Sequence, residues 1–302
     1  MSSGMSSRER RAARDVVGSR MKMYESATKV TLDPTQPWMV RADGHSFSKF
    51  TKGLVKPFDS RLSAVMVATM LDTVAKFNAL TGYTHSDEIT LVFGPADVEA
   101  GQTLAYNGKV SKIVSLVAAY ISVRFNAHML AYDWSDLSET TRVGILACEA
   151  HFDARAFSVP HAAEAWANLL WRSNHDCRRN SVSMLARVYY SAKQLHGIST
   201  RDVLAMLEDE HGVAWEAQPR FFTRGTVAKK ELYDMAAIDR KTGEAVVAKR
   251  SRFVARAFPL SDDSSAAMAD LVLAKYWPDD FDPQRATVVD AASIAASGFV
   301  PA

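Results

Sequence analysis

The sequence predicts an α+β fold, in which an antiparallel-biased sheet is backed by two helices and followed by a helical and basic C-terminal part. Apolar and polar residues alternate over 38–43 and again over 83–93, which is typical of half-buried strands. Apolar residues recur at helical spacing over 62–77 and 110–130. Because strands and helices alternate along the chain, the two helices are expected to cover the sheet.

Composition restricts the class of protein. The 302 residues, of which 48% are hydrophobic, are enough for a real core and exclude a disordered chain. Cys148 and Cys177 are too few for a disulfide framework or a structural zinc site, so a reducing compartment, the cytoplasm, is expected. We find no apolar run of about 18 residues and no signal peptide, so a soluble protein without a membrane partner is expected. The net charge of +2 combines +7 over 1–256 with −5 over 257–302, which permits a polyanionic partner.

The first segment, residues 1–19, is rich in Ser and Arg. A flexible, solvated helical extension is the simpler interpretation, and a basic arm that touches nucleic acid is the alternative. A helix over 21–28 precedes the Pro34 and Pro37 breakers, after which the first strand begins. In that strand Trp38, Val40 and Ala42 point to one face, and Met39, Arg41 and Asp43 to the other.

The next elements are expected to bring two acidic motifs together. Asp59 or Ser60 is a natural N-cap for the 62–77 helix, which is expected to end at Gly82. The hairpin over 83–93 then carries Ser-Asp-Glu at its turn. If this hairpin neighbours the first strand, Asp43 and Asp87 converge at one edge of the sheet.

The remaining elements follow from local pattern. After the 110–130 helix we expect a strand over 143–149, and then helices over 166–171, 174–192 and 203–210. Gly225 and Gly243 punctuate a basic segment that weakly indicates a β-ribbon. Beyond 258, a helix over 265–276 is expected in a tail that is otherwise loosely ordered.

Two carboxylate motifs at strand ends are the strongest chemical signal. Asp43 precedes Gly44, and Asp87 lies between Ser86 and Glu88. Mg²⁺ prefers oxygen ligands from one or two carboxylates and completes its shell with water and phosphate oxygens. Gly44 would let its own carbonyl approach a metal and let backbone amides approach a triphosphate. Each motif alone is more typical of a turn or a cap, but the pair around one helix favours a two-metal site.

Cationic side chains near the same predicted edge are candidates for phosphate binding. Lys56, Lys109 and Lys112 lie near turns or helix starts, and Ser111 would add a hydroxyl. Any one of these lysines alone is more typical of a solvated surface.

An arginine stripe is the candidate surface for nucleic acid. Arg172, Arg179 and Arg187 are spaced seven and eight residues apart, so an unbroken helix would present them on one face, with Arg178 flanking and Trp171 nearby. A charged surface face paired to residues such as Asp176 is an equally weighted interpretation. The histidines show no metal-ligand spacing and Cys148 is expected to be buried, so neither supports zinc.

These motifs together resemble the tRNA(His) guanylyltransferase family and its relatives, the 3′-to-5′ polymerases. Order and spacing agree over roughly 20–230. The matching stretches are Arg20–Glu25, Arg41–Lys52, Lys56–Asp59, Ser86–Glu88, Ser111–Ser115, Phe152–Arg155 and Trp171–Asn180.

The resemblance implies a palm-like catalytic domain with a polymerase/cyclase-type ferredoxin-like core. We expect four regions along the chain. They are a flexible extension over 1–19, the catalytic domain over 20–157, a helical and ribbon part that contacts tRNA over 158–258, and an acidic, loosely ordered tail over 259–302. In such enzymes a nucleoside triphosphate, ATP or GTP, activates the tRNA 5′ end, which the 3′-hydroxyl of an incoming GTP then attacks.

The resemblance also implies roles for single residues. Asp43, Asp87 and the Gly44 carbonyl would bind two Mg²⁺ ions, with Glu88 in support. The nucleotide triphosphate would be bound by His45, Ser46, Phe47, Ser48, Lys56, Ser86, Ser111 and Lys112. The tRNA would be bound by Arg172, Arg178, Arg179, Asn180 and Arg187. A homo-oligomer, a tetramer by family analogy, is expected.

One departure from the family pattern concerns the substrate. Eukaryotic members have His-Ile-Asn-Asn where this chain has Arg178-Arg179-Asn180-Ser181, so only Asn180 is kept. That motif is associated with addition of the extra G to histidine tRNA. Templated repair of 5′-truncated tRNAs is therefore the second hypothesis. An inactive palm that only binds RNA and a cyclase-like enzyme that needs no RNA are further alternatives.

Overall fold

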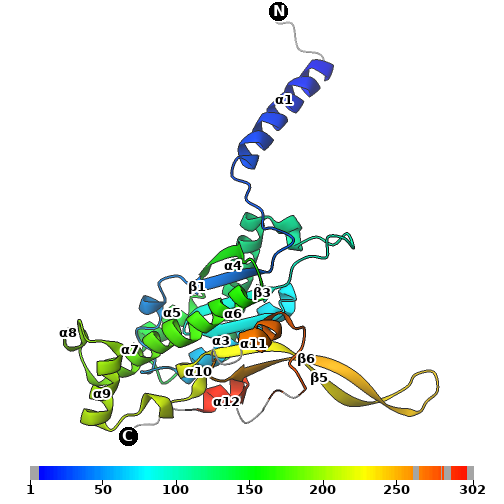
Figure 1. Cartoon of the computed structure of the whole chain (residues 1–302). Helices are drawn as coiled ribbons and strands as arrows, with labels where there is room; N and C mark the ends of the chain where they lie inside the picture. Colours follow the sequence, from blue (N-terminus) through cyan, green and yellow to red (C-terminus); the bar gives the residue numbers. More distant parts are fainter. Residues whose placement is uncertain (1–6, 261–264, 280, 282–286, 298–302) are drawn as a thin grey trace, which may run out of the picture.

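A seven-stranded antiparallel sheet is the centre of the computed structural model, which describes residues 7–260, 265–279, 281 and 287–297. The strand order is β4-β1-β3-β2-β5-β6-β7, and every pair of neighbours is antiparallel. Helices cover both faces of this sheet (Figure 1). The predicted α+β class with an antiparallel sheet is confirmed.

The first four strands and two helices form a βαββαβ unit. Their order along the chain is β1 (Trp38–Gly44), α3 (Ser60–Phe77), β2 (Thr81–His85), β3 (Glu88–Phe93), α4 (Val110–Met129) and β4 (Phe152–Ser158). Because β1 lies between β3 and β4, the spatial order 4-1-3-2 is that of a ferredoxin-like core. The expected hairpin over 83–93 is the β2–β3 pair.

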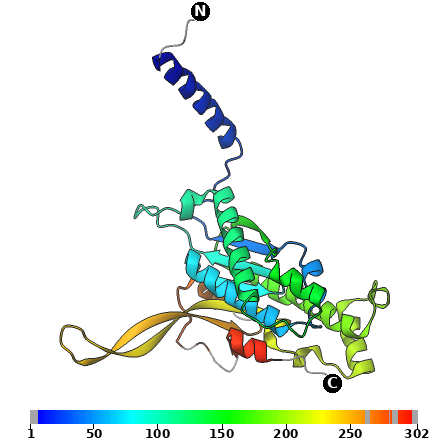
Figure 2. The ribbon, with the colours of Figure 1, turned by 180° about the vertical axis from the view of Figure 1, so that it is seen from behind.

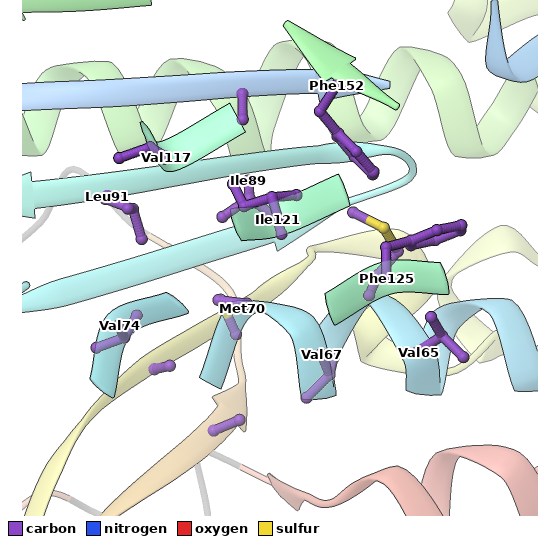
Figure 3. Packing of buried hydrophobic residues seen from close by; sticks show 14 of the residues in the cluster. Val65, Val67, Met70, Val74, Ile89, Leu91, Val117, Ile121, Phe125 and Phe152 are labelled. Carbon is purple, nitrogen blue, oxygen red and sulfur yellow. The ribbon is translucent and has the colours of Figure 1, made fainter. Parts of the chain in front are cut away.

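α3 and α4 pack side by side on one face of this unit. Val40 and Ile89 from the strands meet Met70 of α3 and Ile121 of α4 in a single apolar cluster (Figure 3). The predicted alternation in β1 is confirmed, because Met39 belongs instead to the cluster on the opposite face. Among the described helices, α4 is long and apolar enough to cross a membrane by length and composition, but its buried side chains pack in this cluster.

Two predicted boundaries are wrong. Residues 143–149 were expected as a strand, but α5 (Glu139–Leu146) occupies most of them, because Ser138 caps the Thr141 N–H and helical spacing buries Ile145. α3 ends at Asn78, which takes the left-handed conformation, and not at Gly82. Gly82 lies inside β2, where a Cβ would come within 2.5 Å of Val74.

The other face of the sheet is covered by α6 (Ala162–Trp171) and α11 (Ser265–Leu273), which also contact each other. Lys229 fastens this layer, because its buried ammonium donates to the carbonyls of Leu80 and Ala274 and to the Thr81 hydroxyl at 2.6–3.0 Å. Burial lowers the pKa of Lys229, and these three acceptors oppose that effect by binding the charged form.

A helical lobe and a long ribbon follow α6. The lobe packs around Leu185, Leu207 and Trp215. Its elements are a π-helical turn (Arg172–Cys177), α7 (Arg178–Tyr189), α8 (Ala192–Leu195), α9 (Thr200–His211), a 3₁₀ turn (Trp215–Ala217) and α10 (Arg220–Thr223). β5 (Thr226–Ile238) and β6 (Ala245–Ala257) form the predicted ribbon, whose far half extends beyond the body (Figure 1).

The described parts of the C-terminal tail pack on the body. β7 (Thr287–Val289) pairs with β6, and α12 (Ala291–Ala296) lies on α3, where Ile294 is buried and the Ser60 hydroxyl donates to the Ala295 carbonyl. Composition indicated a loosely ordered tail, but apolar residues spaced along it add to both faces of the sheet. The remainder of that expectation falls on 261–264, 280, 282–286 and 298–302, outside the described residues.

The N-terminal helix stands away from the body. α1 runs from Ser7 to Ser26, so the helical interpretation of 1–19 is confirmed for its described part, and the helix continues into the predicted 21–28 and ends two residues early. Both views show it projecting from the rest of the chain (Figures 1 and 2). Two short elements complete the structure, α2 (Phe47–Phe50) after β1 and a 3₁₀ turn (Ala105–Gly108) before α4.

Cys148 was expected to be buried but is exposed in a turn after α5, whereas Cys177 is buried. Burial raises the pKa of the Cys177 thiol to about 12, which suppresses the reactive thiolate. We predict that a thiol reagent at neutral pH modifies Cys148 of the native protein quickly and modifies Cys177 only after unfolding. Mass mapping after partial labelling checks this, and rapid labelling of Cys177 in the native protein would contradict it.

Candidate active site

The pairing of β1 with β3 brings the predicted carboxylates together. Asp43 lies opposite Glu88 in the ladder, and the Gly44 N–H donates to the Asp87 carbonyl at 3.0 Å. The two strands run in opposite directions, so the end of β1 meets the start of β3 at one end of the sheet. The predicted convergence of Asp43 and Asp87 is confirmed.

A further carboxylate, Asp153, lies beside this pair and was missed from the sequence. It is opposite Asp43 on the other side of β1, in β4. The pKa of Asp43 is raised, first by burial and then by the negative charges of Asp87 and Asp153. Alternation over 152–158 was the signal for β4, but the strand had been assigned to 143–149.

The neighbouring carboxyls are also held in a setting that disfavours their charge. Burial raises the pKa of Asp87. A hydrogen bond of 2.8 Å from the Ser86 hydroxyl lowers it, but by less. Burial raises the pKa of Glu88 to about 7, although Arg172 and Arg41 lie 3.5 and 3.8 Å from its oxygens. The negative charges of several partly buried acids at one end of the sheet are therefore not fully balanced by nearby cations. Such a site favours the binding of a cation.

The donor set fits magnesium better than a metal that requires a closed protein cage. Among the described residues, no three acidic, histidine or cysteine side chains are grouped as a ready-made site. Asp43 and Asp87 supply carboxylate oxygens, and Gly44 adds a carbonyl directly after Asp43. Mg²⁺ is commonly held by one or two carboxylates while water and substrate phosphates complete its shell.

The turn after β1 provides backbone donors beside these acids. Ser46 has φ of 57°, and the helical residues of α2 follow it, which is an alternation that makes anion-binding concavities from successive N–H groups. The N–H groups of Ser46, Phe47 and Ser48 have no hydrogen-bond acceptor within the described part of the chain. The Phe47 ring is buried against Phe125, so only its backbone is available to a nucleotide.

Gly44 has a packing reason as well as a chemical one. A Cβ built at this position would lie 2.3 Å from the Phe47 ring, so the turn can close over the core only with glycine here. His45, next along the turn, stacks on His151 with ring centroids 4.9 Å apart, and its N–H donates to the His151 carbonyl. The turn is therefore fixed from both sides.

A cavity of about 380 Å³ opens beside Asp87. Phe58, Phe221 and Phe222 contribute to its apolar wall, and Lys56 and Arg187 bring positive charge to it. Burial, and secondarily the Arg187 charge, lowers the pKa of Lys56, as expected for two neighbouring cations in a partly buried site. Ser48, Ser86 and Asn180 also line the cavity, so it gathers residues predicted for the triphosphate and for the tRNA.

The structure does not bring the α4 residues to this site. Lys109, Ser111 and Lys112 lie at the start of α4, where Val110 donates to the Val30 carbonyl, close to the beginning of β1. Asp43 is at the other end of β1, about 17 Å along a strand that rises about 3.3 Å per residue. The prediction of one common edge is wrong within this chain, because α4 starts where β3 ends and runs back toward the acids.

The predicted arginine stripe is divided among different surroundings. Residues 172–177 form a π-helical turn, which closes i→i+5 hydrogen bonds and so shifts the phase of all later residues. The Arg172 side chain is only 17% exposed and ion-pairs with Glu88 and Asp176. Arg178 lies over the Trp215 ring, Arg187 lines the cavity and Arg179 is exposed. The expectation of one common face is therefore wrong.

Comparison with known proteins matches this chain to one protein family and to a viral relative. Residues 18–160 match the family model described as tRNAHis guanylyltransferase. An uncharacterized protein, R259, of Acanthamoeba polyphaga mimivirus is 36% identical in an alignment of 226 positions, and the match covers 72% of this chain and 77% of that protein.

Solved structures agree with that match. A bacterial tRNA(His) guanylyltransferase-like protein in complex with ATP has a TM-score of 0.69 and 27% identity, and the match covers 85% of this chain and 98% of that one. The GTP complex of a bacterial protein of the same description has a TM-score of 0.63 and 25% identity, covering 85% and 99%. The tRNA(His) guanylyltransferase of Saccharomyces cerevisiae, at 19% identity and a TM-score of 0.54 over 73% and 92%, shares the fold.

Proposed function

The chain belongs to the tRNA(His) guanylyltransferase family of nucleotidyltransferases, and from this premise we propose that it adds GMP from GTP to the 5′ end of tRNA(His) in the 3′-to-5′ direction by two-metal-ion chemistry. One observation carries the proposal: Asp43 and Asp87 lie together where the end of β1 pairs with the start of β3. A cavity lined by two cationic side chains, Lys56 and Arg187, opens beside them. The nucleotide complexes of the bacterial relatives support ATP and GTP as its substrates.

The steps of the proposed reaction are those that the family resemblance implies. The 5′-phosphate of the RNA attacks the α-phosphorus of ATP and pyrophosphate leaves; the 3′-hydroxyl of GTP then attacks the activated RNA phosphate and AMP leaves. The RNA then ends in a guanosine 5′-triphosphate, and attack of water on its α-phosphorus releases pyrophosphate and leaves the added GMP. Lys56 and Arg187 line the cavity and would bind a triphosphate there. The N–H groups of 46–48, which have no acceptor among the described residues, would offer a second set of donors. When bound by Asp43, Asp87 and the Gly44 carbonyl, two Mg²⁺ ions would supply neutralisation of the phosphate charge.

The direct test uses labelled tRNA(His) transcripts that carry a 5′-monophosphate or a 5′-triphosphate. With ATP, GTP and Mg²⁺, we expect both to gain one nucleotide, and the monophosphate to require ATP. Excess EDTA should stop the reaction and added Mg²⁺ should restore it. If neither transcript is extended under any of these conditions, the proposed function fails.

A second candidate is templated repair of 5′-truncated tRNAs. It is favoured by Arg178 and Arg179, which stand where the family's eukaryotic members carry a motif associated with the histidine-specific step. Arg178 lies over Trp215 and Arg179 is exposed, so neither reproduces the neutral side chains of that motif. Sequencing the products from full-length and 5′-truncated tRNA distinguishes the two: a single G for the first function, several templated nucleotides for the second.

A further inference from the structure

An aromatic pair is exposed on the outer face of the helical segment between α6 and α7. Trp171 and His175 stack with ring centroids 4.3 Å apart and planes inclined by 24°. Trp171 is 54% exposed, and the side chain of Arg179, four residues after His175, is 69% exposed. We call these three residues the platform. The two rings present an open π surface, and Arg179 follows about one helical turn later on the same exposed segment.

The inner face of the same segment belongs to the candidate active site. Arg172 follows Trp171 and lies 3.5 Å from the Glu88 carboxylate. Asp176, which follows His175, pairs with Arg172 and accepts from Arg179 at 3.3 Å. A continuous series of contacts therefore runs from the strand that carries the acids to the platform, which places the platform at the border of the site.

The segment is also held in place. The Ser173 hydroxyl donates to the Arg224 carbonyl at 2.9 Å, and the Asn174 amide donates to the Leu260 carbonyl at 3.0 Å. Two separate parts of the chain thus fix the turn that carries His175. A ligand on the platform would meet rings that are already ordered, which reduces the entropy lost on binding.

The chemistry of the platform matches one kind of ligand. A flat aromatic face binds another flat ring by stacking, and a guanidinium beside it binds an anion, so together they suit a nucleobase joined to its phosphate. Stacking needs a base that is not paired in a duplex. At the acceptor end of a tRNA, the 3′ nucleotides are unpaired and adjoin the 5′ end, which the proposed function places at the acids.

We propose that Trp171 and His175 are the stacking surface for an unpaired base at the 3′ end of the RNA substrate, with Arg179 at its phosphate. This proposal rests on the proposed function for the identity of the RNA. The proposal gives the outer face of the segment over 171–179 a binding role, while Arg172 on its inner face contacts Glu88. A free nucleotide and an aromatic side chain of a protein partner are the competing occupants.

The test measures RNA affinity by fluorescence anisotropy, with full-length tRNA and with the same tRNA lacking its unpaired 3′ nucleotides. Trp171→Ala should weaken binding of the full-length tRNA by about ten-fold, the amount expected for one lost base stack. Trp171→Phe, which keeps a ring, should recover most of that loss. Tyr24→Ala, which removes an equally exposed ring on α1, is the matched control and should bind like the wild type.

Two further readouts decide the occupant. With the shortened tRNA, Trp171→Ala and the wild type should bind equally, and a 2-aminopurine at the 3′ end of full-length tRNA should be quenched by the wild type but not by Trp171→Ala. Equal weakening with both RNAs, equal weakening for free GTP, or no weakening at all would overturn the proposal. These measurements need no nucleotide addition, so an inactive wild type that binds RNA would refute the proposed function and leave the platform standing.

Discussion

Replacing Asp43 with asparagine should lower the rate of nucleotide addition by about a thousand-fold, because a lost metal carboxylate removes several kcal/mol of transition-state stabilisation. The fold should persist. In the absence of metal the pKa of Asp43 is raised by burial and by Asp87 and Asp153, so its charge is unfavourable in the native state. A neutral side chain of the same shape relieves that repulsion.

Thermal unfolding with and without Mg²⁺ separates the loss of metal binding from damage to the fold. The melting temperature of the wild type should rise with Mg²⁺, since a ligand bound by the native state stabilises it, whereas that of Asp43→Asn should not. Asp209→Asn, an exposed position on α9, is the control and should behave like the wild type in both assays. Retained activity, or an unchanged response to Mg²⁺, would remove Asp43 from the site.

Replacing Arg172 with methionine should lower the free energy of unfolding by about 3 kcal/mol, as expected when one partner of a largely buried ion pair is removed. Arg172 lies between two carboxylates, Glu88 and Asp176, whose side chains are also mostly buried. Without the guanidinium, Glu88 would keep only Arg41, at 3.8 Å, and Asp176 only the exposed Arg179, so both acids would hold a less compensated charge or take up protons. We also expect reduced nucleotide addition, because Glu88 would lose its position beside Asp43.

Urea unfolding of single and double variants measures this coupling. Adding Glu88→Gln to Arg172→Met should cost less stability than the sum of the two single changes, since the second change removes one uncompensated charge. Arg201→Met is the matched control, because Arg201 forms an exposed pair with Asp202 and should have little effect. Additive losses at Arg172 and Glu88 would show that the pair does not interact in solution.

The parts of the site that were predictable depend on local pattern. Alternation over 38–43 established which side chains share a face of β1, and Ser-Asp-Glu at a hairpin turn located the second acid. The cap of α3 was predictable to within one residue, Asp59 or Ser60, because capping is local; in the structure the Asp59 side chain accepts from the Arg61 N–H. Asp153 was missed because its strand had been assigned nine residues too early, to a stretch whose spacing is helical.

The sequence by itself determined two strand-end carboxylates, the long helix between them and the order of strand, helix, hairpin, helix and strand, because periodicity and turn chemistry act over a few residues. Only the tertiary structure decided which cations join the acids. Lys56 and Arg187 reach the cavity, whereas Lys112 starts a helix at the opposite end of the sheet, because the direction of α4 depends on how it crosses back to β4. The π-helical turn, which begins at Arg172, likewise changed the phase of Arg179 relative to Arg172, since helical phase depends on every residue that precedes a position. Arg172 therefore meets Glu88 while Arg179 is exposed.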